Sequence, residues 1–295
     1  MDQLHTPPLM ERLKSLALYP LPHHGISRLV GHATRWRNPL WKNTLIRTFI
    51  RAYDVNLDEA EDRDAADWPD FNSFFTRSLR DGTRPLPDDP TALASPVDGT
   101  VSALGRIEAG QLIQAKGQRF SLQALLGGDP ALTERFRDGS FLTVYLSPRD
   151  YHRVHMPGAG RLERMIHVPG RLFSVAPHTV RTVPRLFARN ERVVSLFQGP
   201  SEPFAVIMVG AMCVASIETV WHGVVTPPAG RRVRAWDYHD DSRDLRQGDE
   251  MGRFNMGSTV ILVYPRGAVR WAEALGPGDT VRLGQKVGAW LQGIE

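Results

Sequence analysis

Apolar residues in the first third of the chain recur at the spacing of α-helices. In segments 13–17 and 41–50 they stand three and four residues apart, which places them on one face of a helix. Prolines separate the two segments. A third short helix or capped turn is expected over 71–80, after the acidic stretch 58–70.

The pattern changes at about residue 92, where short runs of β-type residues alternate with Gly, Pro and Asp. Strands at this spacing indicate a sheet-rich core of sandwich or barrel type. We therefore expect an α+β fold in which residues 1–70 form an amphipathic helical segment and residues 71–295 a β-rich catalytic domain. The expected strands are TVSALGRI, QLIQAKG, FLTVYLSP, RLERMIHVPG, RVVSLFQ, FAVIMVGAMCVASIETVW, STVILVYP, AVRWAE and TVRLGQKVGAW.

Two pairs of segments have similar patterns of glycine and apolar residues. Segment 96–101 is echoed by 157–162, and segment 248–254 is echoed by 284–290. These echoes suggest an internal duplication of strand-hairpin units, although two unrelated turn-strand units also produce such a match.

Positive charge is concentrated near the start of the chain. Residues 1–55 contain eight Lys or Arg and three acidic residues, together with Trp, Leu and Phe. A basic helix with these apolar residues on its other face suits an anionic membrane surface. Nucleic acid also attracts basic segments, but no nucleic-acid motif is present, so we expect none as a partner. The remaining alternative is a helix packed on its own domain.

Composition limits several other classes of protein. With 42% hydrophobic residues, the chain can bury a sizeable core, and its single cysteine, Cys213, excludes an intramolecular disulfide. The longest apolar run, 204–215, is too short to span a bilayer as a helix. The first residues lack the pattern of a signal peptide, so we expect no export.

Gly257 and Ser258 stand where a turn enters a buried strand. A serine hydroxyl can attack the preceding carbonyl and convert the amide into an ester, and glycine removes the Cβ that would hinder the attack. β-Elimination of this ester leaves dehydroalanine, which hydrolyses to a pyruvoyl group. A plain turn entering a strand is the commoner meaning of this motif.

Activation of a serine requires a base and usually a carboxylate that orients it. His152 and His155 are the candidate bases. A strand would turn their rings to opposite faces and a helical turn to the same side, and Pro148 favours the turn. A His-x-x-His pair also occurs in metal sites, but no third ligand is evident and we expect no metal. Asp98 is the candidate carboxylate, although Asp-Gly is also a common hairpin turn.

The segments that contain these residues, taken together, resemble the phosphatidylserine decarboxylase family. The likeness extends from about residue 70 to the end, and only Met256, where the family usually has Leu, departs from its motif. The segments are FFTRSLR (74–80), SPVDGTV (95–101), YLSPRDYHRVHMP (145–157), LFARNERVV (186–194) and EMGRFNMGSTVI (250–261).

The resemblance implies self-cleavage between Gly257 and Ser258 into a β chain, 1–257, and an α chain, 258–295, that begins with pyruvoyl. In this family pattern His155 is the base and Asp98 its partner, so that Asp98, His155 and Ser258 form a triad. His152 then serves decarboxylation, near the substrate carboxylate or as a proton donor.

The resemblance also implies the reaction and its location. The pyruvoyl carbonyl forms a Schiff base with phosphatidylserine and accepts the electrons left by CO₂, which yields phosphatidylethanolamine. The amine must first lose a proton, so we expect a near-neutral pKa for His152. The family is attached peripherally to the membrane, here expected at the cytoplasmic face, as an assembly of its two fragments or a dimer of these.

The residues that hold the head group are chosen by charge and position alone. They are Arg77, Lys116, Arg149 and Tyr151.

Three alternatives stay open at this point. A pyruvoyl-dependent decarboxylase of a soluble amino acid leaves the basic N-terminal segment unexplained. A Ser-His-Asp hydrolase would keep Ser258, but the Gly-x-Ser-x-Gly elbow is missing. A biotinyl- or lipoyl-type carrier hairpin over 276–290 would need a lysine at its tip, and Lys286 lies past the turn.

Overall fold

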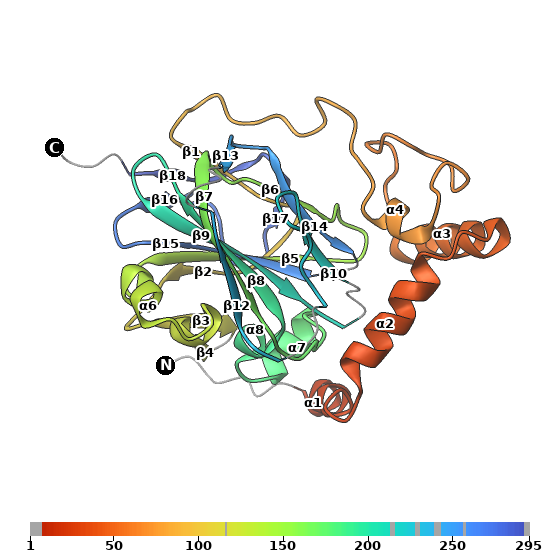
Figure 1. Cartoon of the computed structure of the whole chain (residues 1–295), viewed down its shortest axis with the longest axis horizontal. Coiled ribbons are helices and arrows are strands. Elements are labelled where there is room, and N and C mark those ends of the chain that lie inside the picture. Colours follow the sequence, from red (N-terminus) through yellow and green to blue (C-terminus); the bar gives the residue numbers. More distant parts are fainter. Residues whose placement is uncertain are drawn as a thin grey trace.

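The computed structural model describes residues 8–115, 117–212, 216–227, 231–238, 243–255 and 258–291. A large antiparallel sheet forms the centre of the molecule, and two smaller sheets pack on one of its faces. Short helices cover the other face. Three N-terminal helices form an arm beside this β-rich core (Figure 1).

The large sheet has nine strands, and the strand that begins at Ser258 lies near its middle. This strand, β15 (Ser258–Tyr264), pairs with β5 (Ser140–Leu146) on one side and with β9 (Pro203–Gly210) on the other, so both of its edges are hydrogen-bonded. The order across the sheet is β12 (Arg234–Asp237), β7 (Gly160–Val168), β8 (Arg192–Gln198), β9 (Pro203–Gly210), β15 (Ser258–Tyr264), β5 (Ser140–Leu146), β2 (Gly99–Arg106) and β17 (Thr280–Val281), with β13 (Arg243–Leu245) also paired to β7.

The two smaller sheets enclose the main hydrophobic core against the large sheet. Val154, Ile217 and Phe254 from one of them and Val287 from the other are buried in the same cluster as Val260 and Leu262 of β15. The first sheet has the order β11 (Gly223–Val224), β10 (Ser216–Thr219), β14 (Glu250–Asn255) and β6 (Arg153–His155), and the second β1 (Ala92–Ala94), β18 (Lys286–Trp290) and β16 (Val269–Trp271).

A second hydrophobic cluster lies on the opposite face of the large sheet. Alternate residues of β15, such as Ile261 and Val263, point to this face and pack with Phe136 and Phe187. The covering elements are the hairpin of β3 (Gln111–Ala115) and β4 (Gln118–Ser121) and the helices α5 (Leu122–Leu125), α6 (Pro130–Phe136), α7 (Pro177–Thr182) and α8 (Leu186–Arg189).

The N-terminal arm is joined to the core at both of its ends. At its start, Ser15 bonds Thr182 of α7, and at its end α3 packs on α4 through Ile46, Phe71 and Phe74. The arm consists of α1 (Leu9–Leu16), α2 (His23–Thr34) and α3 (Pro39–Tyr53), and α4 (Phe71–Phe75) follows it along the chain. The boundary expected at residue 70 stays a prediction. Among the described residues, the helices lack the length and apolarity needed to cross a bilayer.

The predicted α+β, β-rich fold is confirmed, and the differences have local causes. α2 was not predicted, although Ile26, Leu29, Val30 and Ala33 stand at helical spacing, because its two glycines lower the helix propensity of HHGISRLVGHAT. Helices α5 to α8 have four to seven residues each, too few for a periodic pattern. The echoed segments do begin strands at matching points, β2 with β7 and β14 with β18.

A buried arginine fixes two of the covering helices. Arg192 donates to the carbonyl oxygens of Ala124 and Leu125 at the end of α5, and to those of Ala188 and Asn190 at the end of α8. The carbonyl end of a helix attracts a cation, which offsets part of the cost of burying the charge. Burial nevertheless lowers the pKa of Arg192 to about 9.

We expect Arg192→Leu to lower the free energy of unfolding by about 3 kcal/mol, because buried carbonyl groups lose their donors. Chemical denaturation of parent and variant measures this change. Arg119→Leu is the control, since its ion pair with Glu108 is exposed and its loss costs less than about 1 kcal/mol. Equal losses in the two variants would contradict the bridging role of Arg192.

Candidate active site

The candidate cleavage point lies at one end of the large sheet. The backbone of Ser258 pairs with Leu146 of β5 and Gly210 of β9. Met256 and Gly257 lie outside the described residues, as does Lys116. The neighbouring strands therefore fix the first residue after the predicted cut on both sides.

The LFARNERVV segment supports this end of the sheet. Asn190 donates from Nδ2 to the Gly210 carbonyl oxygen at 2.9 Å, and the Gly210 N–H donates to the Glu191 carbonyl oxygen at 2.8 Å. Asn190 also bonds both backbone groups of Phe173. The residue opposite Ser258 is thus held by hydrogen bonds at both its N–H and its C=O.

His152 is buried beside the strand that leads to Ser258. Its carbonyl oxygen accepts the Phe254 N–H at 3.0 Å, and its ring packs on Phe75 with centroids 4.0 Å apart. Nδ1 donates to the Asp150 carbonyl oxygen at 2.7 Å, whereas Nε2 has no partner among the described residues. The ring therefore presents an unoccupied acceptor nitrogen in a dry environment.

The expectation of a near-neutral pKa for His152 is wrong in this structure. Burial disfavours the charged ring and Arg77 adds repulsion, which together lower the pKa to about 3. His152 is consequently a neutral imidazole at physiological pH, and its Nε2 can accept a hydrogen bond but carries no proton to donate.

The structure also decides how the two histidines are related. Arg153–His155 is strand β6, so the helical turn that Pro148 favoured does not form. His152 lies at full burial against Phe75, while His155 faces a hollow of about 210 Å³ under residues 79–86. The two rings therefore lie in separate surroundings, which agrees with the strand that would turn them to opposite faces.

His155 is fixed by hydrogen bonds at both ring nitrogens. Nδ1 donates to the Gly248 carbonyl oxygen at 2.8 Å, so Nε2 accepts from the Tyr151 hydroxyl at 3.0 Å. Burial lowers the pKa of His155 and keeps the ring neutral. The nitrogen that would act as a base is therefore occupied by Tyr151.

Asp98 is held mainly by Arg84. Arg84 donates from Nε to Oδ1 at 3.0 Å and from Nη2 to Oδ2 at 2.6 Å, and the Leu283 N–H reaches Oδ1 at 2.8 Å. Burial disfavours the charge of Arg84, but its bonds to Asp98 and Glu59 outweigh burial and raise the guanidinium pKa. Among the described side chains, Asp98 and His155 have different partners, so no hydrogen bond joins these two members of the predicted triad.

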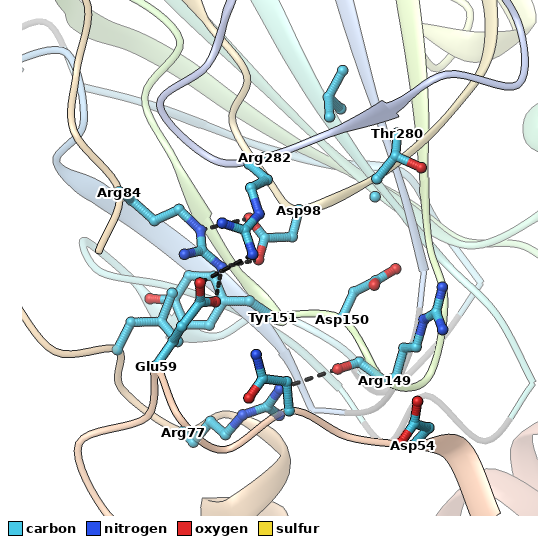
Figure 2. A pocket seen from close by; sticks show the side chains of 14 residues that line it. Asp54, Glu59, Arg77, Arg84, Asp98, Arg149, Asp150, Tyr151, Thr280 and Arg282 are labelled. Atoms are coloured by element: carbon cyan, nitrogen blue, oxygen red, sulfur yellow. Dashed lines mark hydrogen bonds and ion pairs between the residues drawn. The ribbon is translucent and has the colours of Figure 1, made fainter. Parts of the chain in front are cut away.

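A hollow of about 320 Å³ adjoins Asp98, and Tyr151 lines both this hollow and the one that contains His155. Arg77 and Arg149, two of the predicted head-group contacts, line it as well (Figure 2). The charges fall into two zones in the figure, with Arg84, Arg282, Glu59 and Asp98 in one and Arg77, Arg149, Asp150 and Asp54 in the other.

The second zone contains the less engaged cations. Arg77 is buried and donates from Nη2 to the Arg149 carbonyl oxygen at 3.1 Å, but its Nε has no partner among the described residues. Burial lowers the pKa of Arg77. Arg149 is exposed at the rim. Both features suit an anionic group bound between them.

Sequence reasoning missed several residues of this site. Arg84 pairs with both Asp98 and Glu59, and Phe75 covers His152. Phe75 lies in the FFTRSLR segment, which carries part of the family resemblance. Glu59 lies in the acidic stretch 58–70 and Arg84 just after residues 71–80, and no motif marks either residue.

Comparison with known proteins decides the family. The model of the family described as phosphatidylserine decarboxylase matches residues 71–289, and a second model, described as PSD, matches residues 13–54. The chain belongs to the phosphatidylserine decarboxylase family. The resemblance seen in the sequence is thereby confirmed.

Relatives in this family match the chain over nearly its whole length. A phosphatidylserine decarboxylase proenzyme from Alkalilimnicola ehrlichii is 58% identical over 86% of this chain and 88% of its own. Proteins of the same name from Methylococcus capsulatus and Pseudomonas putida are 52% and 51% identical, over 92% and 96% of this chain and 94% and 100% of theirs. The word proenzyme in these names implies processing of the relatives.

The burial of His152 predicts how stability depends on pH in this phosphatidylserine decarboxylase. The unfolded chain binds a proton at His152 below about pH 6.5, whereas the folded chain does so only near pH 3. Stability from this group is therefore lost as pH falls through that window. We expect His152→Gln to reduce the slope of unfolding free energy between about pH 6 and 4 by up to about 1.4 kcal/mol per unit.

Urea unfolding at a series of pH values measures this slope. His222→Gln is the matched control, since His222 is exposed and its replacement leaves the slope as in the parent. A parent slope that persists in His152→Gln would mean that His152 is charged in the folded chain.

Proposed function

We propose that this chain is made as a precursor, cleaves itself between Gly257 and Ser258, and then converts phosphatidylserine to phosphatidylethanolamine and CO₂. One observation carries the proposal. The backbone ladders bring Asp98, the histidine segment and Ser258 to the same end of the large sheet, because Thr100 pairs with Tyr145 and Ser258 with Leu146.

Cleavage would begin at the Ser258 hydroxyl. Its oxygen attacks the Gly257 carbonyl carbon and the nitrogen leaves as the ester forms, while a base takes the hydroxyl proton. Loss of the Ser258 α-hydrogen then breaks the ester and releases the Gly257 carboxylate. Hydrolysis of the remaining dehydroalanine liberates ammonia and leaves a keto group on the fragment 258–295.

His155 and Asp98 are the proposed base and orienting group for this step. His155 is neutral and can accept a proton at Nε2, provided that Tyr151 releases that nitrogen. The state described here therefore corresponds to a resting arrangement, in which Tyr151 occupies the ring nitrogen of the base.

The residues around His152 fit a pyruvoyl group in the mature enzyme. The keto group would condense with the substrate amine and accept the electron pair left by CO₂. His152 offers a buried acceptor nitrogen beside the strand that ends near Ser258, and in the neutral form it can accept a hydrogen bond from the substrate amine. Phe75 and the surrounding burial keep water away from this nitrogen.

The hollow beside Asp98 is the proposed head-group pocket. Arg77 and Arg149 would bind the phosphate, and the carboxylates of Asp54 and Asp150 complement a cationic amine. Tyr151 completes the wall next to His155. A head group with both anionic groups and an ammonium matches this mixture of charges better than a neutral ligand does.

The N-terminal arm is the proposed membrane-binding surface at the cytoplasmic face. Leu29 and Leu40 are 72% and 82% exposed, and Arg28 and Arg37 lie close to them in sequence. Free nucleic acid would not favour so many exposed apolar side chains, whereas a lipid surface buries them. The exposed apolar residues of the arm are Leu9, Met10, Leu13, Leu16, Leu29, Trp36, Leu40, Trp41 and Tyr53.

A cleavage series tests the reaction. Ser258→Ala removes the nucleophile and His155→Ala the base, so both should stay uncleaved and inactive. His152→Ala should cleave and yet turn over no lipid, since its role lies in decarboxylation. Intact mass, reaction with a hydrazine and release of CO₂ from phosphatidylserine give the three readouts.

Each outcome distinguishes a different claim. A processed Ser258→Ala chain would remove the pyruvoyl assignment, and an uncleaved His152→Ala chain would merge the two histidine roles. A parent chain that remains at 33.0 kDa with no hydrazine-reactive carbonyl would favour the hydrolase alternative.

Membrane binding has its own test. The double variant Leu13→Glu, Leu40→Glu removes two exposed apolar contacts, each worth about 1.5–3 kcal/mol if fully buried in lipid. We expect the affinity for anionic vesicles, measured by flotation, to fall by at least about tenfold. Ile113→Glu, which alters an exposed apolar residue outside the arm, is the control. Equal loss in the control would contradict binding through the arm.

A further inference from the structure

Arg84 is the most fully engaged charged side chain next to the proposed triad. Its side chain is 9% exposed, and its three nitrogens all donate hydrogen bonds. Nε and Nη2 hold the two oxygens of Asp98, Nη2 also bonds Glu59 at 2.8 Å, and Nη1 bonds the Thr83 carbonyl oxygen at 2.9 Å. The guanidinium is therefore fixed in one orientation.

The contact joins parts of the chain that lie far apart in sequence. Glu59 follows the N-terminal arm, Arg84 lies in the segment that crosses above His155, and Leu283, whose N–H also bonds Asp98, belongs to the proposed C-terminal fragment. Arg282 adds an ion pair to Glu59 at 3.0 Å. Asp98 thus has its position set by groups on both sides of the predicted cut.

We propose that Arg84 is a positioning residue for self-cleavage, which holds the Asp98 carboxylate in the orientation that lets Asp98 support the base. This inference rests on the proposed function of Asp98. Arg84 acts through Asp98 and does not itself contact the scissile bond. A guanidinium is required for two parallel bonds to one carboxylate, which a lysine cannot make.

Arg84 is the nearest of several charged groups around Asp98. Asp98 is 14% exposed at its side chain, and Arg84 is the cation in direct contact with it. Arg77 from the end of α4 also attracts it, whereas Asp150 from the segment between β5 and β6 repels it. Tyr151 and His155 face it as neutral groups, Glu59 lies behind Arg84, and Arg282 is turned to Glu59.

Removal of Arg84 therefore leaves a partly buried carboxylate with its nearest counter-charge gone. Protonation then becomes easier, and a protonated Asp98 cannot stabilise a cationic His155. The acid limb of the pH–rate profile, where cleavage slows as pH falls, should therefore move to higher pH. A residue that only stabilised the fold would lower the yield of folded protein without moving the profile.

The experiment follows cleavage of the full-length chain made by cell-free synthesis, from about pH 5 to 9, by gel electrophoresis. We expect Arg84→Gln to slow cleavage at least about tenfold near neutral pH, which is less than the roughly 10⁴-fold effect of disabling a triad carboxylate. We also expect the acid limb of its pH–rate profile to move upward by about one pH unit. Arg84→Lys keeps the charge, so its acid limb should stay with the parent while its maximal rate falls.

Arg181→Gln is the matched control. Arg181 makes the same two-bond contact with a carboxylate, that of Glu11, and its side chain is also partly buried, but it joins α7 to α1 away from Asp98. We expect parent-like cleavage at every pH. Thermal melting of each chain shows whether it is folded.

Three results would overturn the inference. They are a parent-like rate and profile in Arg84→Gln, a parent-like maximal rate in a folded Arg84→Lys, and an equal slowing in Arg181→Gln. If Arg84→Gln does not fold, Arg84→Lys decides. Asp98→Asn distinguishes the role of Asp98 from that of Arg84. Normal cleavage in Asp98→Asn removes the proposed role of Asp98. Blocked cleavage in Asp98→Asn together with normal cleavage in the Arg84 variants removes only the role of Arg84.

Discussion

Pairing of β15 on both edges is the constraint on which the rest of the site depends. Because Ser258 is bonded between Leu146 and Gly210, its backbone cannot shift without breaking ladders in the middle of the large sheet. Asn190 fixes Gly210 in turn. Reaction of a hydroxyl with its own peptide bond requires such fixed geometry, since effective concentration depends on orientation.

Burial then determines the charge of each group near this strand. His152 and His155 lie among apolar and backbone groups that keep them neutral, while Asp98 is held by Arg84 through two hydrogen bonds. Arg77 is buried, and its Nε has no partner among the described residues. The site thus separates neutral rings from fixed charges.

The sequence allowed prediction of the β-rich class and of the arm, since alternation and helical spacing are local patterns. It also gave Asp98, His152, His155 and Ser258 as candidate site residues, and their roles stay predictions. The partners of these residues were not predictable, because the bond from Asp98 to Leu283 joins residues 185 positions apart and depends on the folded sheet. Burial of His152 under Phe75 was equally hidden, which is why its pKa was misjudged.

The end of α3 belongs to the N-terminal arm and also lies next to the hollow beside Asp98. Asp54 and Asn56 follow this helix directly and form part of the wall of the hollow beside Asp98. Deleting residues 1–55 would therefore breach the cavity as well as remove helices α1 to α3. Lost turnover in such a truncated chain would confound anchoring with catalysis, and point changes on the outer surface of the arm separate the two.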